Sequence, residues 1–115
     1  MADPESYEIS ALCYAVRTNR KHHENFIGSA WSDPMHDQDE PIAYYVWTLK
    51  NANRTVVVDT GFDKTEWSRR TENSGGLWQC EYDQSPAEGL TGIGVDTRQV
   101  QDVIVTHLHY DHAGS

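Results

Sequence analysis

The chain has 115 residues, enough for one domain, and carries 18 Asp and Glu against 9 Lys and Arg, a formal net charge of −9. This acidic balance argues against binding to nucleic acid or to an anionic membrane surface, since both need clustered Lys and Arg. No apolar stretch approaches the roughly 20 residues of a membrane-spanning helix. The first residues, MADPESYE, lack the basic and apolar regions of a signal peptide. We therefore expect a soluble, cytoplasmic protein without nucleic-acid or membrane partners.

The first half of the chain predicts strands. In residues 5–18, Tyr7, Ile9 and Ala11 alternate with polar residues, and beyond Leu12 both faces become apolar. Residues 42–49 and 54–59 are rich in β-branched and aromatic side chains, and the intervening Lys-Asn-Ala-Asn has turn chemistry. This pattern indicates one strand followed by a β-hairpin.

Residues 19–41, between those strands, are polar and irregular. They include potential metal-ligating side chains, namely Asp33, His36, Asp37, Asp39 and Glu40. Loops collect such residues without ligand geometry, so the segment favours a solvated acidic loop over a metal site. A loop of this length is also typical of a lid or of a wall of a substrate site.

The second half alternates helix starts with a strand. Asp63 is placed to cap a helix over residues 64–71, and Ser85 followed by Pro86 starts a second one. Asp96 opens a third, short turn. The apolar run 103–106 predicts a strand buried on both faces. The fold class is thus α/β or α+β with layers, and the two cysteines, Cys13 and Cys80, are too few for a disulfide framework.

The chemistry is concentrated in the segment THLHYDHAG, which contains three of the six histidines. Side chains two residues apart in an extended chain share a face, so His107 and His109 point the same way. If the chain then curls, Asp111 and His112 add a second pair of donors beside the first. Imidazole and carboxylate suit zinc, iron and manganese, and the absence of a nearby thiolate argues against a structural Cys-rich zinc site.

This segment resembles the metal-binding signature H-x-H-x-D-H of the metallo-β-lactamase superfamily. Two further stretches resemble the same family: TVVVDTG at 55–61, and residues 89–104, which lead into the histidines. The N-terminal part is most similar to the branch of N-acyl-homoserine lactonases. The resemblance implies an αβ/βα sandwich, of which residues 1–115 form the N-terminal αβ half, truncated after the motif. Three further metal ligands of the family come later in its chains.

The resemblance also implies roles for individual residues. His107 and His109 bind the first of two divalent ions, and Asp111 and His112 bind the second; zinc is expected first, with iron, manganese and cobalt as alternatives. Asp59 lies close to the ions and holds their ligands in position. Alternatively, Asp-Thr-Gly is only a turn at the end of the strand, where this sequence is common.

The implied reaction is hydrolysis of a lactone by a hydroxide that bridges the two metals, with Asp111 as the catalytic residue that passes a proton to the leaving alkoxide. The substrate is a small lactone or ester. Two alternatives stay open: another hydrolase of the same fold, such as a glyoxalase-II-like thioesterase, and a non-catalytic metal-binding fragment. Residues 1–115 alone are expected to be inactive, because each metal has only two of its ligands.

Overall fold

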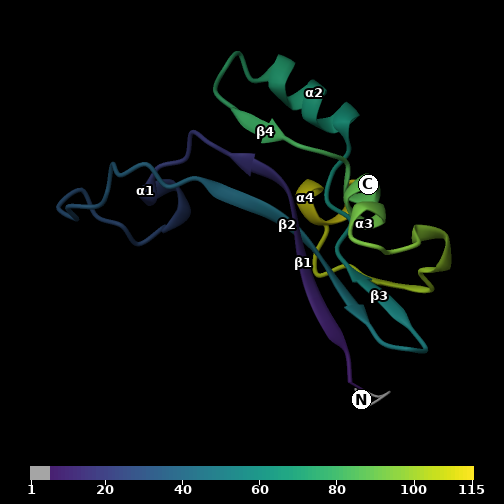
Figure 1. Ribbon diagram of the computed structural model, residues 1–115. Coiled ribbons are helices and arrows are strands. Elements are labelled where there is room, and N and C mark those ends of the chain that lie inside the picture. Colours follow the sequence, from purple (N-terminus) through teal and green to yellow (C-terminus); the bar gives the residue numbers. More distant parts are fainter. Residues whose placement is uncertain (1–5) are drawn as a thin grey trace.

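A computed structural model describes residues 6–115, which form a mixed α/β fold around one five-stranded sheet (Figure 1). The strand order is β4-β1-β2-β3-β5; β5 runs parallel to β3, and all other neighbours are antiparallel. The strands are β1 (Glu8–Arg17), β2 (Ile42–Lys50), β3 (Thr55–Val58), β4 (Cys80–Tyr82) and β5 (Asp102–Ile104). The predicted N-terminal strand and the hairpin of β2 and β3 are confirmed; residue 5 lies outside the described residues.

Two of the helices begin where the sequence places their caps. The Asp63 carboxylate accepts a hydrogen bond from the Glu66 amide at 2.9 Å, and the Ser85 hydroxyl accepts one from the Glu88 amide at 3.1 Å. Each cap satisfies an amide that has no partner inside its helix. The helices are α1 (His22–Asn25), α2 (Lys64–Asn73), α3 (Pro86–Gly92) and α4 (Tyr110–Ala113), with a 3-10 turn at Thr97–Gln99. None of these described helices has the length and apolar character needed to cross a membrane.

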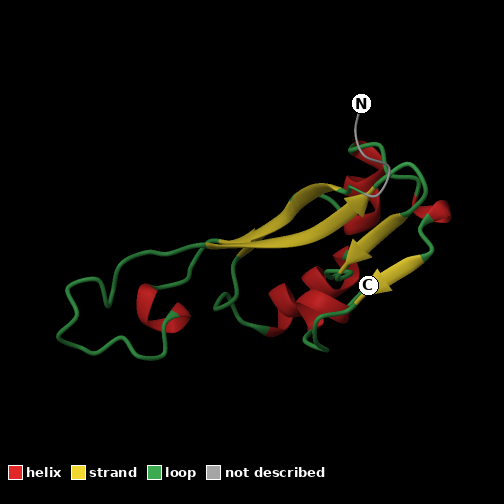
Figure 2. Ribbon diagram, turned by 90° about the horizontal axis from the view of Figure 1, so that it is seen from below, coloured by secondary structure: helices red, strands yellow, loops and turns green. Residues whose placement is uncertain are grey.

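The core lies between one face of the sheet and the helices. Alternate residues of β2 are buried, and Tyr14 of β1 and Phe62 are fully enclosed. Helices α2, α3 and α4 contribute Trp67, Leu90 and Tyr110 to the same cluster. Three helices therefore cover one face of the sheet, as Figure 2 shows.

The opposite face of the sheet is apolar and exposed. Strand pairing aligns a row of side chains across it, Ala11, Trp47, Val58 and Ile104. Trp47 is 42 % exposed and Ile104 is 51 % exposed. In the first half of β1 the predicted apolar face is exposed, as at Ile9 and Ala11, so the expected facing of this half is wrong. Beyond Leu12 the neighbours Tyr14 and Ala15 are both buried, as the sequence predicts.

The expectation that residues 103–106 are buried on both faces is also wrong. Strand β5 forms the edge of the sheet, pairs only with β3 among the described residues, and is exposed along its length. A run of β-branched residues indicates a strand but does not distinguish a central strand from an edge strand. Both cysteines are free thiols, as expected.

The segment between β1 and β2 projects from one end of the sheet and carries α1 (Figures 1 and 2). We refer to residues 18–41 as the β1–β2 loop. Its two arms are joined by backbone pairing between Lys21 and Asp39 and by hydrogen bonds from the amides of His22 and Glu40 to the opposite arm, both 2.8 Å. The loop is therefore an ordered substructure, not an irregular chain.

Candidate metal centre

The H-x-H-x-D-H segment begins beside the end of β3. Because β3 and β5 are parallel neighbours, their carboxyl ends meet at the same edge of the sheet. The Asp59 amide donates a hydrogen bond of 2.7 Å to the Ile104 carbonyl at this edge. The predicted Asp-Thr-Gly turn and the predicted metal motif, about 50 residues apart in sequence, are thus in direct contact.

Asp59 connects the turn to the motif. Its side chain is buried, with the residue only 4 % exposed, and it accepts hydrogen bonds from the Thr106 amide at 2.8 Å and the Thr106 hydroxyl at 2.9 Å. His112 Nδ1 lies 2.7 Å from the other carboxylate oxygen. Burial raises the pKa of this carboxyl group, but the bonds from Thr106 and His112 outweigh it and hold the pKa below its ordinary value. Asp59 is therefore ionised and fully paired.

The pairing with Asp59 orients His112. An ionised carboxylate only accepts, so His112 Nδ1 carries the proton and Nε2 keeps its lone pair. Nε2 lies 3.3 Å from an Asp111 carboxylate oxygen, which places an imidazole nitrogen and a carboxylate side by side. This is the donor arrangement that binds divalent transition metals, with the outer carboxylate fixing the ring as it does in many histidine–metal sites.

The other two histidines of the motif complete the cluster. The rings of His107 and His109 lie 4.8 Å apart between centroids, and those of His107 and His112 lie 3.9 Å apart. After His109 the chain curls into α4, as the sequence predicts. All four predicted ligands thus lie together at the end of β5, and Asp59 lies behind them. The donor set fits a divalent metal.

Contacts to the core hold α4 in place. The Tyr14 hydroxyl donates to the Asp111 carbonyl at 3.3 Å, and the hydroxyls of Tyr44 and Tyr110 are 3.2 Å apart. Burial is the main cause that raises the pKa of both Tyr14 and Tyr44, so both remain neutral hydrogen-bonding groups. The guanidinium of Arg70 lies 3.4 Å from the centre of the Tyr110 ring.

An open cleft of about 500 Å³ adjoins the motif. His107, His109 and Asp111 line it on one side. Its other walls combine aromatic and cationic side chains, contributed by Tyr44, Trp78, Tyr110, Arg17, Arg20 and Arg70. Its volume is within the range of small-molecule sites.

A second group of donors lies in the β1–β2 loop and combines His36 and Asp37, two potential ligands of this segment in the sequence, with His23, which the sequence did not single out. Within residues 6–115, one set of three His, Cys, Asp or Glu side chains offers ligand atoms all within 4.8 Å of one another: His23, His36 and Asp37. The expectation of a solvated loop is wrong for His36, which is 6 % exposed. His23 lies 13 residues from His36 in sequence, so no local spacing signalled the group.

Comparison with known proteins gives a family match and structural neighbours. The family model described as the metallo-beta-lactamase superfamily matches residues 39–115. No curated protein matches the chain. Thirteen solved chains match; five of them, with sequence identities of 15–18 %, show a shared fold.

Three of these structures illustrate the match. A quorum-quenching N-acyl homoserine lactone lactonase has a TM-score of 0.66 and 18 % identity, covering 99 % of this chain and 42 % of that one. An N-acyl homoserine lactone hydrolase with its product N-hexanoyl-L-homoserine bound at the catalytic metal centre has a TM-score of 0.61 and 15 % identity, covering 98 % and 44 %. A mutant of B. thuringiensis AiiA with N-decanoyl-L-homoserine at its active site has a TM-score of 0.63 and 16 % identity, covering 95 % and 43 %. The chain therefore spans less than half the length of these neighbours.

Proposed function

The chain belongs to the metallo-beta-lactamase superfamily, and from this premise we propose that it is part of a metal-dependent hydrolase that opens lactones, N-acyl homoserine lactones first among them. The observation that carries the proposal is the cluster of His107, His109, Asp111 and His112, fixed by Asp59 at the end of β5. His107 and His109 would hold one divalent ion, and Asp111 and His112 a second. Zinc suits these donors, as do iron, manganese and cobalt.

The chain's own residues have separate tasks in this proposal. When bound, divalent ions supply Lewis acidity and activate water at neutral pH. Asp59 keeps the His112 ring in the tautomer that leaves Nε2 free. Asp111 takes up the proton that the attacking water loses and delivers it to the ring oxygen of the lactone as that oxygen leaves.

The cleft beside the motif is consistent with this class of substrate. Tyr44 and Trp78 offer an aromatic wall for an acyl chain, and the neighbouring arginines offer donors for the polar end of the molecule. The bound products named for two structural neighbours, N-hexanoyl- and N-decanoyl-L-homoserine, combine these two parts.

We further propose that residues 1–115 are the N-terminal part of a single domain. Support comes from the apolar face of the sheet opposite the helices, where Trp47 and Ile104 are about half exposed. A second sheet packed on this face would bury them and give the αβ/βα sandwich. That second part would also supply the remaining metal ligands.

The test is to express the complete reading frame that contains these residues, load it with zinc, and follow opening of N-hexanoyl-homoserine lactone in a pH-stat. A glutathione thioester serves as the competing substrate. We expect lactone hydrolysis that His107→Ala and His109→Ala each reduce by at least about a hundredfold. Preference for the thioester would overturn the lactonase assignment, and full activity in both variants would overturn the ligand assignment.

A further inference from the structure

We propose that the β1–β2 loop contains a second, independent transition-metal site, formed by His23, His36 and Asp37. The three side chains come from α1 and from the turn at 33–37, and they share no residue with the motif at the end of β5. Each offers one ligand atom, and these atoms lie within 4.8 Å of one another. The Asp37 carboxylate is 4.0 Å from His36 Nε2 and lies beside the His23 ring, 3.8 Å from its Nδ1 atom.

The backbone fixes the state of His23. Its Nδ1 lies 2.9 Å from the His36 carbonyl oxygen, and its amide donates to the same oxygen at 3.1 Å. A carbonyl only accepts, so Nδ1 carries the proton and Nε2 keeps a lone pair for a metal. An outer hydrogen bond of this kind orients ligating histidines in established metal sites.

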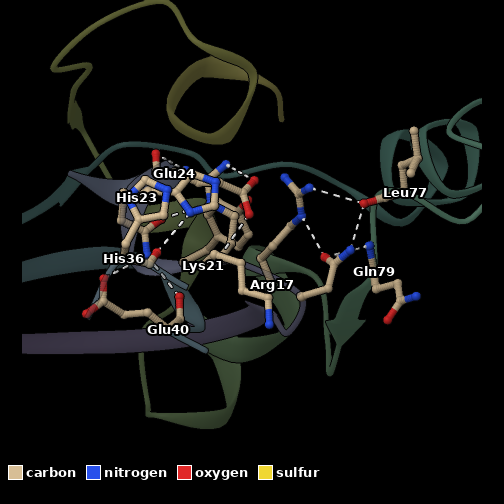
Figure 3. A network of polar contacts seen from close by, with 12 residues as sticks. Arg17, Lys21, His23, Glu24, His36, Glu40, Leu77 and Gln79 are labelled. Atoms are coloured by element: carbon tan, nitrogen blue, oxygen red, sulfur yellow. Dashed lines mark hydrogen bonds and ion pairs between the residues drawn. The ribbon is translucent and has the colours of Figure 1, made fainter. Parts of the chain in front are cut away.

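His36 is the observation that points to a ligand. The residue is 6 % exposed, yet neither Nδ1 nor Nε2 has a hydrogen-bond partner. Buried polar groups without partners are rare and unfavourable, and each such case calls for an explanation. A metal bound by one of these nitrogens satisfies it. The ring is stacked on His23, with centroids 4.4 Å apart (Figure 3), and packs at a tilt of 34° against Trp31, with centroids 4.3 Å apart.

An ion pair and several hydrogen bonds hold the loop in place around the cluster. Lys21 and Asp39 form an ion pair across the base of the loop. Next to it, the Glu40 carboxylate lies 3.1 Å from His22 Nδ1, and the Asn25 amide donates to the Glu40 carbonyl at 2.9 Å. Figure 3 shows this polar network beside the two histidine rings. The donors are therefore held on a preformed frame.

The chemistry of the donors selects the ion. Two neutral imidazoles and a carboxylate are typical ligands of zinc and cobalt(II), and three protein ligands leave a position for water. The rings of His23 and His36 are nearly parallel, with 11° between their planes. Coordination of one ion by both requires a ring to turn, which changes the contact of His36 with Trp31. Trp31 fluorescence thus reports on occupancy of the loop site.

The experiment uses the untagged protein with His107→Asn and His109→Asn, so that the motif at β5 is weakened and the loop is measured separately. Zinc is titrated into metal-free protein by calorimetry, and cobalt(II) is followed by Trp31 quenching, with Trp31→Phe identifying that signal. We expect one equivalent bound, and a loss of affinity of at least about a hundredfold on adding His36→Asn. Chemical shifts of the His23 and His36 ring protons should move with zinc, whereas those of His22 should not.

Asp37→Asn tests the site without touching a buried residue, because the Asp37 side chain is 77 % exposed. We expect it to weaken zinc binding at least about tenfold. The control is Asp102→Asn, which removes the same charge at a 51 % exposed position outside the loop and should leave zinc affinity within about twofold. Equal zinc affinity in the parent, His36→Asn and Asp37→Asn proteins would overturn the proposal, whatever the activity of the complete enzyme.

Discussion

The six histidines of the chain divide equally between two regions, and the two groups are built in opposite ways. At the end of β5, His107, His109 and His112 lie within six residues, and the segment is anchored by one buried acid, Asp59. In the β1–β2 loop, two arms of the chain must meet before His23 and His36 can touch. The first group depends on the sheet for its geometry, whereas the second depends on contacts within the loop itself.

This difference separates two kinds of site. The motif presents exposed imidazoles at a cleft, where a substrate can approach the metals they would bind. The loop instead buries its central ring against Trp31. The first arrangement suits chemistry on a small molecule, and the second suits an ion that braces a loop.

Damage to the sheet edge should therefore disturb the motif and spare the loop. Gly61 has a φ of +67°, and an added Cβ would lie 2.8 Å from atoms of Tyr14 and Pro86. Gly61→Ala combines a left-handed conformation with overpacking, and we expect a loss of roughly 2–5 kcal/mol in the free energy of unfolding. Urea denaturation measures the loss.

Gly75→Ala is the matched control for this substitution. Gly75 has a similar φ of +62° but nothing within 4 Å of the added Cβ, so only the backbone cost of about 1–2 kcal/mol applies. The ring-proton signals of His107 and His112 should shift in Gly61→Ala, while those of His23 and His36 keep their positions. Equal losses in the two variants would show that the space around Gly61 is not tight.

Removal of Asp59 acts on the same edge with a smaller effect. Asp59→Ala leaves the Thr106 amide without its acceptor and frees the His112 ring. We expect a loss of about 1–3 kcal/mol, together with a mixture of His112 tautomers seen in nitrogen-15 spectra. A single Nδ1-protonated tautomer in Asp59→Ala would mean that Asp59 does not set the state of this ring.

Most of the fold, and the whole of the motif, could be predicted from local sequence. Helix caps at Asp63 and Ser85, the hairpin turn and the H-x-H-x-D-H spacing are each contained in a few consecutive residues. Burial could not be predicted in the same way. The exposure of β5 depends on which strand it joins, and the burial of His36 depends on Trp31 and His23 reaching it through a folded loop. The polar composition of residues 19–41 predicts a solvent-exposed loop. Composition carries no information on contacts between distant residues, so it could not predict the burial of His36.

Because the two ring nitrogens of His36 are unpaired, we expect His36 to lower the stability of the metal-free protein and to bind metal when it is added. His36→Phe keeps an aromatic ring between His23 and Trp31 and removes both unpartnered nitrogens. We expect the metal-free variant to gain about 1 kcal/mol in the free energy of unfolding. With zinc added, the parent should gain stability and the variant should not. A purely solvated loop would show neither change, since surface substitutions stay within about ±0.5 kcal/mol.

Acid should loosen the loop through Glu40. Its hydrogen bond from His22, and then that from Asn25, hold the pKa of this carboxyl group below its ordinary 4.5. A depressed folded-state pKa adds stability that is present above pH 4.5 and is lost as the pH falls through the folded value. Between pH 5 and about pH 3, the protection of the His22 and Glu40 amides against hydrogen exchange, relative to the intrinsic rate at each pH, should therefore fall; these amides bridge the loop arms.

The matched variant for this acid response is Glu40→Gln, which keeps a hydrogen-bonding side chain of the same length without a titrating carboxyl group. Its loop amides should be less protected against exchange than those of the parent at pH 5, and their protection should change less on acidification. The pKa of Asp33 is also lowered, first by the hydrogen bond from the Met35 amide and then by that from the Ser29 hydroxyl. Adding Asp33→Asn to the Glu40→Gln protein should therefore remove the remaining acid response. If the Glu40→Gln loop loosens with acid as steeply as the parent loop, Glu40 does not join the two arms. In that case the stacked rings of the loop stabilise it instead, and substitution of His36, rather than a change of pH, would alter its stability.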